Sequence, residues 1–430
     1  METIFALSSG MPPAGIAVLR ISGPQAAQVL RALAGDLPPP RRARLAALRD
    51  GSGALLDRGL ILWFPGPAST TGEDLAELHL HGGRAVVAAV EAALAALPGL
   101  RRAAPGEFTR RAFANGRIDL AEAQGLADLL SAETEMQRRA ALAMAGGAFS
   151  RRLADWRERL LALSARLEAA LDFEDEEDVA GLPPDFAAEV DALGRDIAGF
   201  LNAPHAETLR EGFRIVLSGP PNAGKSTLFN ALIESEAAIT SALAGTTRDV
   251  LVRPVAIAGV PFSFVDTAGL REEGGADEVE AIGIGRALAE LGRADLVLWL
   301  GPEGEGPAGA WEIEAQADRA DRQAKVAPRN RVSALTGEGL AELKHALVEE
   351  AMGAMPGPGE AALDLRQRTL LAEAAEALQD IGEGIGGQLP DQLIVAERLR
   401  LARVAFDRLT GRAATEDMLD ALFGRFCIGK

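Results

Sequence analysis

The chain has 430 residues, more than one hydrophobic core can organise, so two or three domains are expected. No apolar run is long enough to span a bilayer, and the first residues lack the features of a signal peptide. The net charge of −18 argues against general nucleic-acid binding, and the single cysteine, Cys427, excludes an intrachain disulfide framework. We therefore expect a cytoplasmic protein that has no contact with the membrane.

Residues 1–118 have the pattern of a mixed α/β domain. The segments "GIAVLRIS" and "LAELHLHGG" are short apolar runs that predict strands, the second leading into a glycine turn. The alanine-rich segment "RAVVAAVEAALAAL" predicts an amphipathic helix that ends before Pro98 and Gly99.

Helical spacing of apolar residues follows from Leu120 to Leu171, with a break at Gly146 and Gly147. An acidic run and a proline pair separate this region from a further helical segment that extends to about Phe200. From Phe213 the segments "FRIVLSG", "FSFVDTAG" and "ADLVLWLG" predict strands that alternate with helices, which is typical of a parallel sheet. The segment "GAMPGPGE" resembles a linker, and residues 361–424 again predict helices.

The simplest architecture from this order is multidomain, α/β plus all-α. Residues 1–118 would form an N-terminal α/β domain, and residues 119–210 the first half of a helical domain. Residues 211–353 would form an inserted Ras-like P-loop domain, and residues 354–430 the second half of the helical domain. Three sequential domains with a helical tail are the alternative.

The segment "GPPNAGKSTLFN" predicts a phosphate-binding loop, because it lies between a predicted strand and a predicted helix. Backbone amides and the helix N-terminus would hold the phosphates, and Lys225 would place its charge on the β- and γ-phosphate oxygens. Ser226 would supply a hydroxyl to Mg²⁺.

Three further elements follow in the order that a GTPase requires. Thr247 in "AGTTRD" could complete the Mg²⁺ shell, and "FVDTAG" supplies Asp266 for a Mg²⁺ water and Gly269 for the γ-phosphate. The segment "SALTG", which begins at Ser333, matches a loop that lies behind guanine. Together these elements favour GTP over ATP.

Two elements depart from the usual pattern. The guanine-reading motif Asn-Lys-x-Asp is replaced by "AQAD", in which Asp318 keeps the carboxylate that accepts hydrogen bonds from guanine. Asp321 is a competing candidate, and the loss of the Asn and Lys predicts weaker binding with retained guanine preference. Leu270 stands where many small GTPases carry a glutamine that orients water, so hydrolysis needs another device.

The segments "PNAGKSTLFN", "AGTTRDV", "DEVEAIGIGRA" and the terminal "FCIGK" together resemble the tRNA modification GTPase family MnmE, also called TrmE. The N-terminal segments "GIAVLRISG", "GEDLAELHLHGG", "APGEFTRRAF" and "DLAEAQGLADLL" resemble the same family, so the similarity covers nearly the whole chain.

The resemblance implies a K⁺-dependent GTPase and a homodimer joined through an N-terminal domain that binds 5-formyl-tetrahydrofolate or a related folate. The resemblance also implies a partner, an FAD-containing MnmG-type subunit, in an expected heterotetramer. Together the two proteins would install a carboxymethylaminomethyl or aminomethyl group at C5 of the wobble uridine of certain tRNAs. A regulatory GTPase of ribosome assembly is the alternative. A third reading, a scaffold with degraded activity, is motivated by "AQAD".

The resemblance also implies roles for single residues. Asn222, Ser241, Leu243 and Thr246 would ligate K⁺, which replaces an arginine finger, while Ser226 and Thr247 would ligate Mg²⁺. Glu280 would orient or activate water, and Cys427 is a catalytic candidate. The residues expected at the folate are Arg20, Glu77, Arg117 and Lys430. Those expected at GTP are Asn222, Ala223, Gly224, Lys225, Ser226, Thr227, Ser241, Ala242, Leu243, Ala244, Gly245, Thr246, Thr247, Asp266, Thr267, Ala268, Gly269, Asp318, Ser333 and Ala334.

Overall fold

The computed structural model describes residues 2–172, 182–183, 185–202, 206–234, 252–266, 289–322, 324–355, 357, 362–382, 391–413 and 415–429. The chain divides into two compact units. The first comprises Met1–Ala127 together with Phe406–Lys430, and the second comprises Asp128–Ala405. The division into four segments with the bounds given above stays a prediction.

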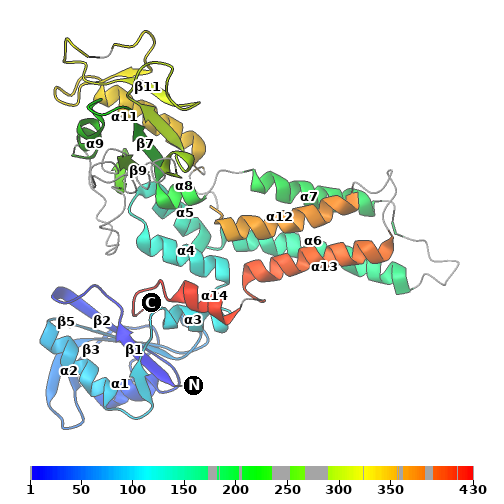
Figure 1. Ribbon diagram of the computed structural model, residues 1–430. Helices are drawn as coiled ribbons and strands as arrows, with labels where there is room; N and C mark the ends of the chain where they lie inside the picture. The colour runs from blue at the N-terminus through cyan, green and yellow to red at the C-terminus, as the bar shows by residue number, and fades with distance from the viewer. Residues whose placement is uncertain are drawn as a thin grey trace, which may run out of the picture. The chain divides into compact units, whose positions relative to one another are not determined.

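The first unit contains a six-stranded sheet with two helices packed against it (Figure 1). The strand order is β3-β4-β5-β2-β1-β6, and all neighbours are antiparallel except β1 and β6. The strands are β1 (Thr3–Leu7), β2 (Ala14–Ser22), β3 (Arg44–Arg49), β4 (Leu55–Phe64), β5 (Leu75–Gly82) and β6 (Leu100–Arg102). The helices α1 (Ala26–Ala34) and α2 (Arg84–Ala95) share one apolar core with alternate residues of the strands, including Leu19, Ile21, Val29, Leu30, Leu78 and Val90.

The C-terminal residues pack against the beginning of the chain within this unit. The ring of Phe423 on α14 (Glu416–Phe423) lies 6.1 Å from that of Phe113 on α3 (Glu107–Ala114). The Ser8 hydroxyl donates a hydrogen bond of 2.8 Å to the carbonyl of Gly429. The sheet and the last turn of the chain are therefore parts of one folded body.

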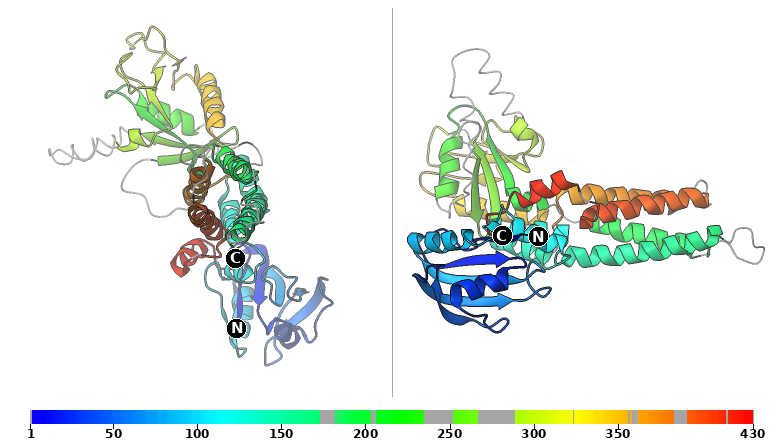
Figure 2. Two further views of the ribbon diagram at one scale, coloured as in Figure 1. Left: turned by 90° about the vertical axis from the view of Figure 1, so that its right-hand side faces the viewer. Right: turned by 90° about the horizontal axis from the view of Figure 1, so that it is seen from below.

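The second unit contains long helices that run side by side (Figures 1 and 2). They are α6 (Ala148–Asp172), α7 (Phe186–Leu201), α12 (Leu365–Gly382) and α13 (Gln392–Thr410), which continues into the first unit. Helix α12 packs along α7, although about 160 residues separate them in the chain. The buried indole of Trp156 on α6 donates a hydrogen bond of 2.9 Å to Asp196 on α7, which joins these two helices.

The predicted helical region from Leu120 is divided into three helices, one more than expected. The predicted break at Gly146–Gly147 separates α5 (Glu135–Ala145) from α6. An earlier break separates α4 (Leu120–Ser131) from α5, where Thr134 and Gln137 form a capping box. The Thr134 side chain accepts from the Gln137 amide, and the Gln137 side chain accepts from the Thr134 amide. The capping box therefore begins a new helix at Glu135, although the helical spacing of apolar residues continues through this point.

The second unit also contains a six-stranded sheet in the order β12-β11-β10-β7-β9-β8. The strands are β7 (Phe213–Ser218), β8 (Val252–Ile257), β9 (Val260–Asp266), β10 (Leu296–Trp299), β11 (Trp311–Glu314) and β12 (Asn330–Arg331). The predicted parallel pairing is confirmed for β7, β9 and β10 to β12, whereas β8 pairs antiparallel with β9. Ala258 and Gly259 both have positive φ angles, 50° and 80°, as a two-residue hairpin turn requires. Helices α8 (Ala206–Glu211), α9 (Lys225–Glu234) and α11 (Leu340–Ala354) contact this sheet.

The docking of α14 against α3 can be tested with two glycines of nearly identical conformation. Gly106 has φ 66°, and a methyl group there would lie 2.2 Å from the Phe423 carbonyl oxygen. Gly116 has φ 64°, and nothing lies within 4 Å of such a methyl group. Both alanine variants bear the left-handed backbone cost of about 1–2 kcal/mol, and Gly106→Ala should lose a further ~1–3 kcal/mol from the clash. The difference between their denaturant midpoints measures the clash, and equal midpoints would contradict this packing.

Candidate functional site: a phosphate loop and a charged cavity

The predicted phosphate loop connects the end of the central strand β7 to the beginning of α9 (Figure 1). The α9 backbone amides at this end have no carbonyl partner within the helix, so they can bind an anion. Lys225 lies at the first position of α9, and its ammonium donates hydrogen bonds of 3.0 and 2.9 Å to the Gly219 and Pro220 carbonyls. Only 7 % of the residue is exposed. The cation is thus fixed over the loop.

Oxygen donors suited to Mg²⁺ meet beside this loop. The Ser226 hydroxyl donates a hydrogen bond of 2.7 Å to a carboxylate oxygen of Asp266, the last residue of β9. Because β7 and β9 are parallel neighbours, their carboxyl ends lie at the same sheet edge, and the topology brings the two side chains together. A hydroxyl and a buried carboxylate fit the hard oxygen ligands that Mg²⁺ prefers, directly or through water.

The two candidate guanine-reading aspartates differ in their partners. The buried Ser333 hydroxyl donates to an Asp318 carboxylate oxygen at 2.5 Å, which brings "AQAD" next to the "SALTG" loop. Asp321 instead accepts two hydrogen bonds from Arg319, at 3.0 and 2.8 Å, and the Arg319 hydrogen bond lowers its pKa. The geometry therefore favours Asp318 over Asp321 as the base-reading residue.

Several predicted site residues lie outside the part of the chain that the structure describes. They are Ser241, Ala242, Leu243, Ala244, Gly245, Thr246, Thr247, Thr267, Ala268, Gly269, Glu280 and Lys430. Asn222, Ala223 and Gly224 lie in the phosphate loop, Thr227 is in α9, and Ala334 follows Ser333. Their ligand contacts stay predictions.

A second group of predicted residues lies on the sheet of the first unit. Arg20 on β2 and Glu77 on β5 are directly opposed in the strand register. The Arg20 guanidinium donates two hydrogen bonds to one Glu77 oxygen, at 3.1 and 2.9 Å, and His79 lies 3.2 Å from the other oxygen. Burial alone would raise the pKa of Glu77, but the hydrogen bonds and charge of Arg20, assisted by His79, lower it below its usual value. Glu77 is therefore an ionised acceptor.

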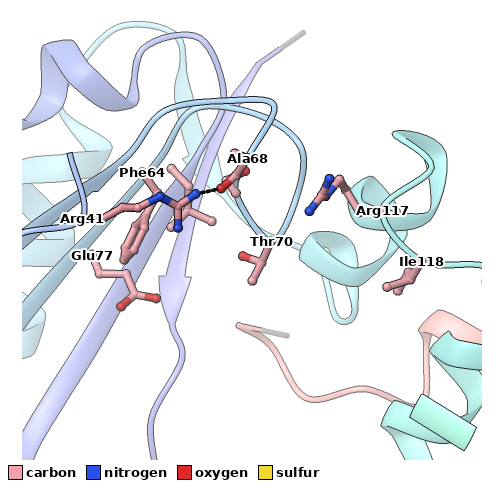
Figure 3. A pocket seen from close by; sticks show the side chains of 9 residues that line it. Arg41, Phe64, Ala68, Thr70, Glu77, Arg117 and Ile118 are labelled. Carbon is pink, nitrogen blue, oxygen red and sulfur yellow. Dashed lines mark hydrogen bonds between the residues drawn. The ribbon is translucent and has the colours of Figure 1, made fainter. Parts of the chain in front are cut away.

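Glu77 lines a cavity of about 410 Å³ that also includes Arg117, and Figure 3 shows these residues on opposite sides of it. Arg41 and Phe64 stand near Glu77, with the guanidinium 5.8 Å from the ring centroid, and Thr70 lies between the two sides. A carboxylate, two guanidinium groups and an aromatic ring fit a ligand that has both a polar heteroaromatic ring and anionic groups. Sequence reasoning missed Arg41, Phe64 and Thr70, because the wall residues share no motif.

Cys427 is exposed. His79 and His81 each contact a carboxylate, Glu77 and Asp57 respectively. Within the ranges that the structure describes, no group of three or more His, Cys, Asp or Glu side chains is arranged to hold a metal ion. None of the helices in those ranges has both the length and the apolar character needed to cross a bilayer.

The loop between β7 and α9 defines a P-loop nucleotide-binding domain, and Asp318 beside Ser333 places it in the GTPase class. Residues 120–427 match the family model of the MnmE helical domain, and residues 3–117 match that of the GTP-binding protein TrmE N-terminus. The chain belongs to the family of the tRNA modification GTPase MnmE, and it is a GTPase.

Individual relatives agree with this assignment. The tRNA modification GTPase MnmE of Novosphingobium aromaticivorans is 63 % identical over 441 residues, and that of Erythrobacter litoralis is 62 % identical over 430 residues. Both similarities cover 100 % of each chain. Among solved structures, the G domain of the T. maritima FeoB iron transporter is 25 % identical and covers 32 % of this chain and 98 % of that one. The TM-score of that similarity is 0.23.

The choice between the two aspartates predicts a difference in nucleotide binding. Asp318→Asn should weaken GTP binding at least about ten-fold, because the carboxylate that accepts from guanine is lost. It should improve binding of xanthosine triphosphate, whose carbonyl can accept from the new amide. Asp321→Asn should change GTP affinity by less than about two-fold, since its exposed ion pair contributes little. Titration with a fluorescent nucleotide checks this, and the reverse ranking would identify Asp321 as the reader.

Proposed function

We propose that this GTPase of tRNA modification hydrolyses GTP in a K⁺-dependent reaction and acts in the cytoplasm as a homodimer. With an FAD-containing MnmG-type subunit, in a heterotetramer, it installs a carboxymethylaminomethyl or aminomethyl group at C5 of the wobble uridine of certain tRNAs. A folate supplies the one-carbon unit. The contact between Ser226 and Asp266, next to Lys225 in the chain, carries the hydrolytic part of the proposal. Membership of the MnmE family favours tRNA modification over ribosome assembly.

Different residues of the nucleotide site would bind different parts of GTP and its Mg²⁺ ion. The loop amides and Lys225 would bind the phosphate oxygens, Ser226 with Thr247 would hold Mg²⁺, and Asp266 would accept from a water on that ion. Mg²⁺ would supply positive charge that neutralises the β- and γ-phosphates. Asp318, supported by Ser333, accepts hydrogen bonds from the guanine ring. This arrangement binds GTP with its γ-phosphate held next to α9.

Hydrolysis needs a further positive charge and an oriented water. Asn222 has the left-handed φ of 63° and is exposed on the loop, which leaves its side chain accessible to an ion. We assign it to K⁺ with Ser241, Leu243 and Thr246. K⁺ would supply the charge that an arginine finger provides elsewhere. Glu280 orients or activates the attacking water, because the apolar side chain of Leu270 cannot. The G domains of two protomers meet so that this loop closes.

The proposed architecture inserts a G domain into a helical domain. The packing of α12 along α7 supports it, because these helices flank residues 213–354 in the chain and lie against each other. A chain segment that leaves and re-enters a bundle between adjacent helices can fold around its own core. The first unit would contribute dimerisation and folate binding.

The cavity of the first unit is the proposed site for 5-formyl-tetrahydrofolate or a related folate. The ionised Glu77 would accept hydrogen bonds from the pterin ring, and Arg20 fixes this carboxylate. Arg117 and Lys430 would bind the glutamate tail. The contact of Gly429 with Ser8 supports a role for the C-terminal motif, because it brings residues next to Lys430 onto this unit. Cys427 is proposed as a catalytic candidate.

The potassium requirement can be tested directly. GTP hydrolysis by the wild-type chain should be at least about ten-fold faster in K⁺ than in Na⁺, since removal of one transition-state charge contact typically costs that much or more. Asn222→Ala should reduce the rate in K⁺ to the Na⁺ level while retaining GTP affinity. Steady-state phosphate release, with ATP as the control substrate, provides the measurement. Equal wild-type rates in both salts would contradict the potassium role.

The folate site predicts a selective loss of binding. Glu77→Gln should weaken 5-formyl-tetrahydrofolate binding by about ten-fold or more, because a charge-assisted hydrogen bond becomes neutral. The lowered pKa of Glu77 means that wild-type affinity should stay constant as pH falls toward 4.5, the ordinary value, and decrease only below it. Glu91→Gln, which breaks an ion pair with Arg102, is the control. Calorimetry that finds equal affinities for both variants would exclude this cavity.

A further inference from the structure

A glutamine outside the phosphate loop reaches that loop. Gln316 follows β11, and its side-chain amide donates a hydrogen bond of 3.2 Å to the main-chain carbonyl of Asn222. The two residues are 94 positions apart in the chain. Gln316 stands where the usual guanine-reading motif Asn-Lys-x-Asp has its lysine. The sequence predicts that this replacement weakens nucleotide binding, yet the glutamine contacts the phosphate loop.

Gln316 also packs against the next glycine of the loop. Gly224 has φ 92°, and a methyl group added to it would lie 3.2 Å from the Gln316 amide nitrogen and 3.3 Å from its Cγ. The side chain therefore fills the space that the missing Cβ leaves. The amide contacts the loop on both sides of Ala223, by a hydrogen bond at Asn222 and by close packing at Gly224.

The backbone on either side of Gln316 is held in place. The Ala317 amide donates to the Val332 carbonyl at 3.0 Å, and the Val332 amide donates to the Glu314 carbonyl at 2.9 Å. Gln316 itself has a φ of 56°, and Asn222 has 63°, so both are non-glycine residues in the left-handed region. Such conformations persist where the surrounding contacts impose them. The hydrogen bond joins these two positions.

We propose that Gln316 is a positioning residue that fixes the Asn222 peptide and thereby couples the guanine-reading loop to the phosphate loop. The inference rests on the GTPase function proposed above and adds a role to a residue that the proposed phosphate and K⁺ contacts do not include. Asp318 lies two residues after Gln316. Binding of guanine at Asp318 therefore stabilises the same short segment that holds Asn222 in its catalytic conformation.

The discriminating variant is Gln316→Glu, which keeps the size and the Cβ of the side chain but replaces the donor by a carboxylate facing a carbonyl. The turnover number in saturating GTP should fall by about three- to ten-fold, the usual effect of one lost hydrogen bond. The ratio of GTP to inosine triphosphate affinity, which reports on Asp318, should stay at the wild-type value. Gln316→Lys, which restores a donor, should recover most of the turnover.

Gln379→Ala, at an exposed position of α12, is the control and should leave the turnover number and the affinity ratio unchanged. The proposal is overturned if Gln316→Glu keeps wild-type turnover, or if it changes the base preference instead. The K⁺ concentration for half-maximal activation is measured on the same variants and should rise in Gln316→Glu. A wild-type rate that is indifferent to K⁺ would refute the ion role of Asn222, but the loss of turnover in Gln316→Glu would still be required.

Discussion

Two contacts between residues far apart in the chain determine which segments share a folded unit. The outer contact joins Ser8 to Gly429, which are 421 positions apart, and the inner contact packs α12 along α7. The chain leaves the first unit after Ala127 and returns to it at Phe406, and within the second unit it leaves α7 and returns to pack α12 against it. The first unit therefore consists of two segments that are far apart in the chain, whereas the second is one continuous segment whose helices α7 and α12 pack together over a long sequence separation.

The nucleotide site shows how a parallel sheet gathers chemistry from distant residues. Strand β7 provides the loop before Lys225, β9 ends in Asp266, and the segment after β11 brings Gln316 and Asp318 to the same edge. Lys225, Asp266 and Asp318 come to one edge of the sheet because the carboxyl ends of parallel strands coincide. Asn222 and Gln316, which both have a left-handed φ, lie where loops from two different strands touch.

The sequence predicts the local parts of this structure well, because they depend on neighbouring residues. The loop around Lys225 needs only a strand, glycines and a helix start in succession. The family resemblance predicts Arg20 and Glu77 only as folate contacts, and their opposition on β2 and β5 could not be predicted because strand register depends on the whole sheet. The break at Thr134 was missed because apolar spacing continues through a capping box. The partner of Phe423 is equally hidden, since an apolar helix face does not specify what covers it.

The outer contact has a consequence for the order of events during translation. The six strands of the first sheet are complete once residue 102 has been synthesised, and this sheet can fold early. Its contact with Gly429 cannot form until more than 300 further residues have left the ribosome. The residues around Gly429, which are proposed to complete the folate site, would thus reach it only after they have been translated. A prematurely terminated product would retain the sheet without them.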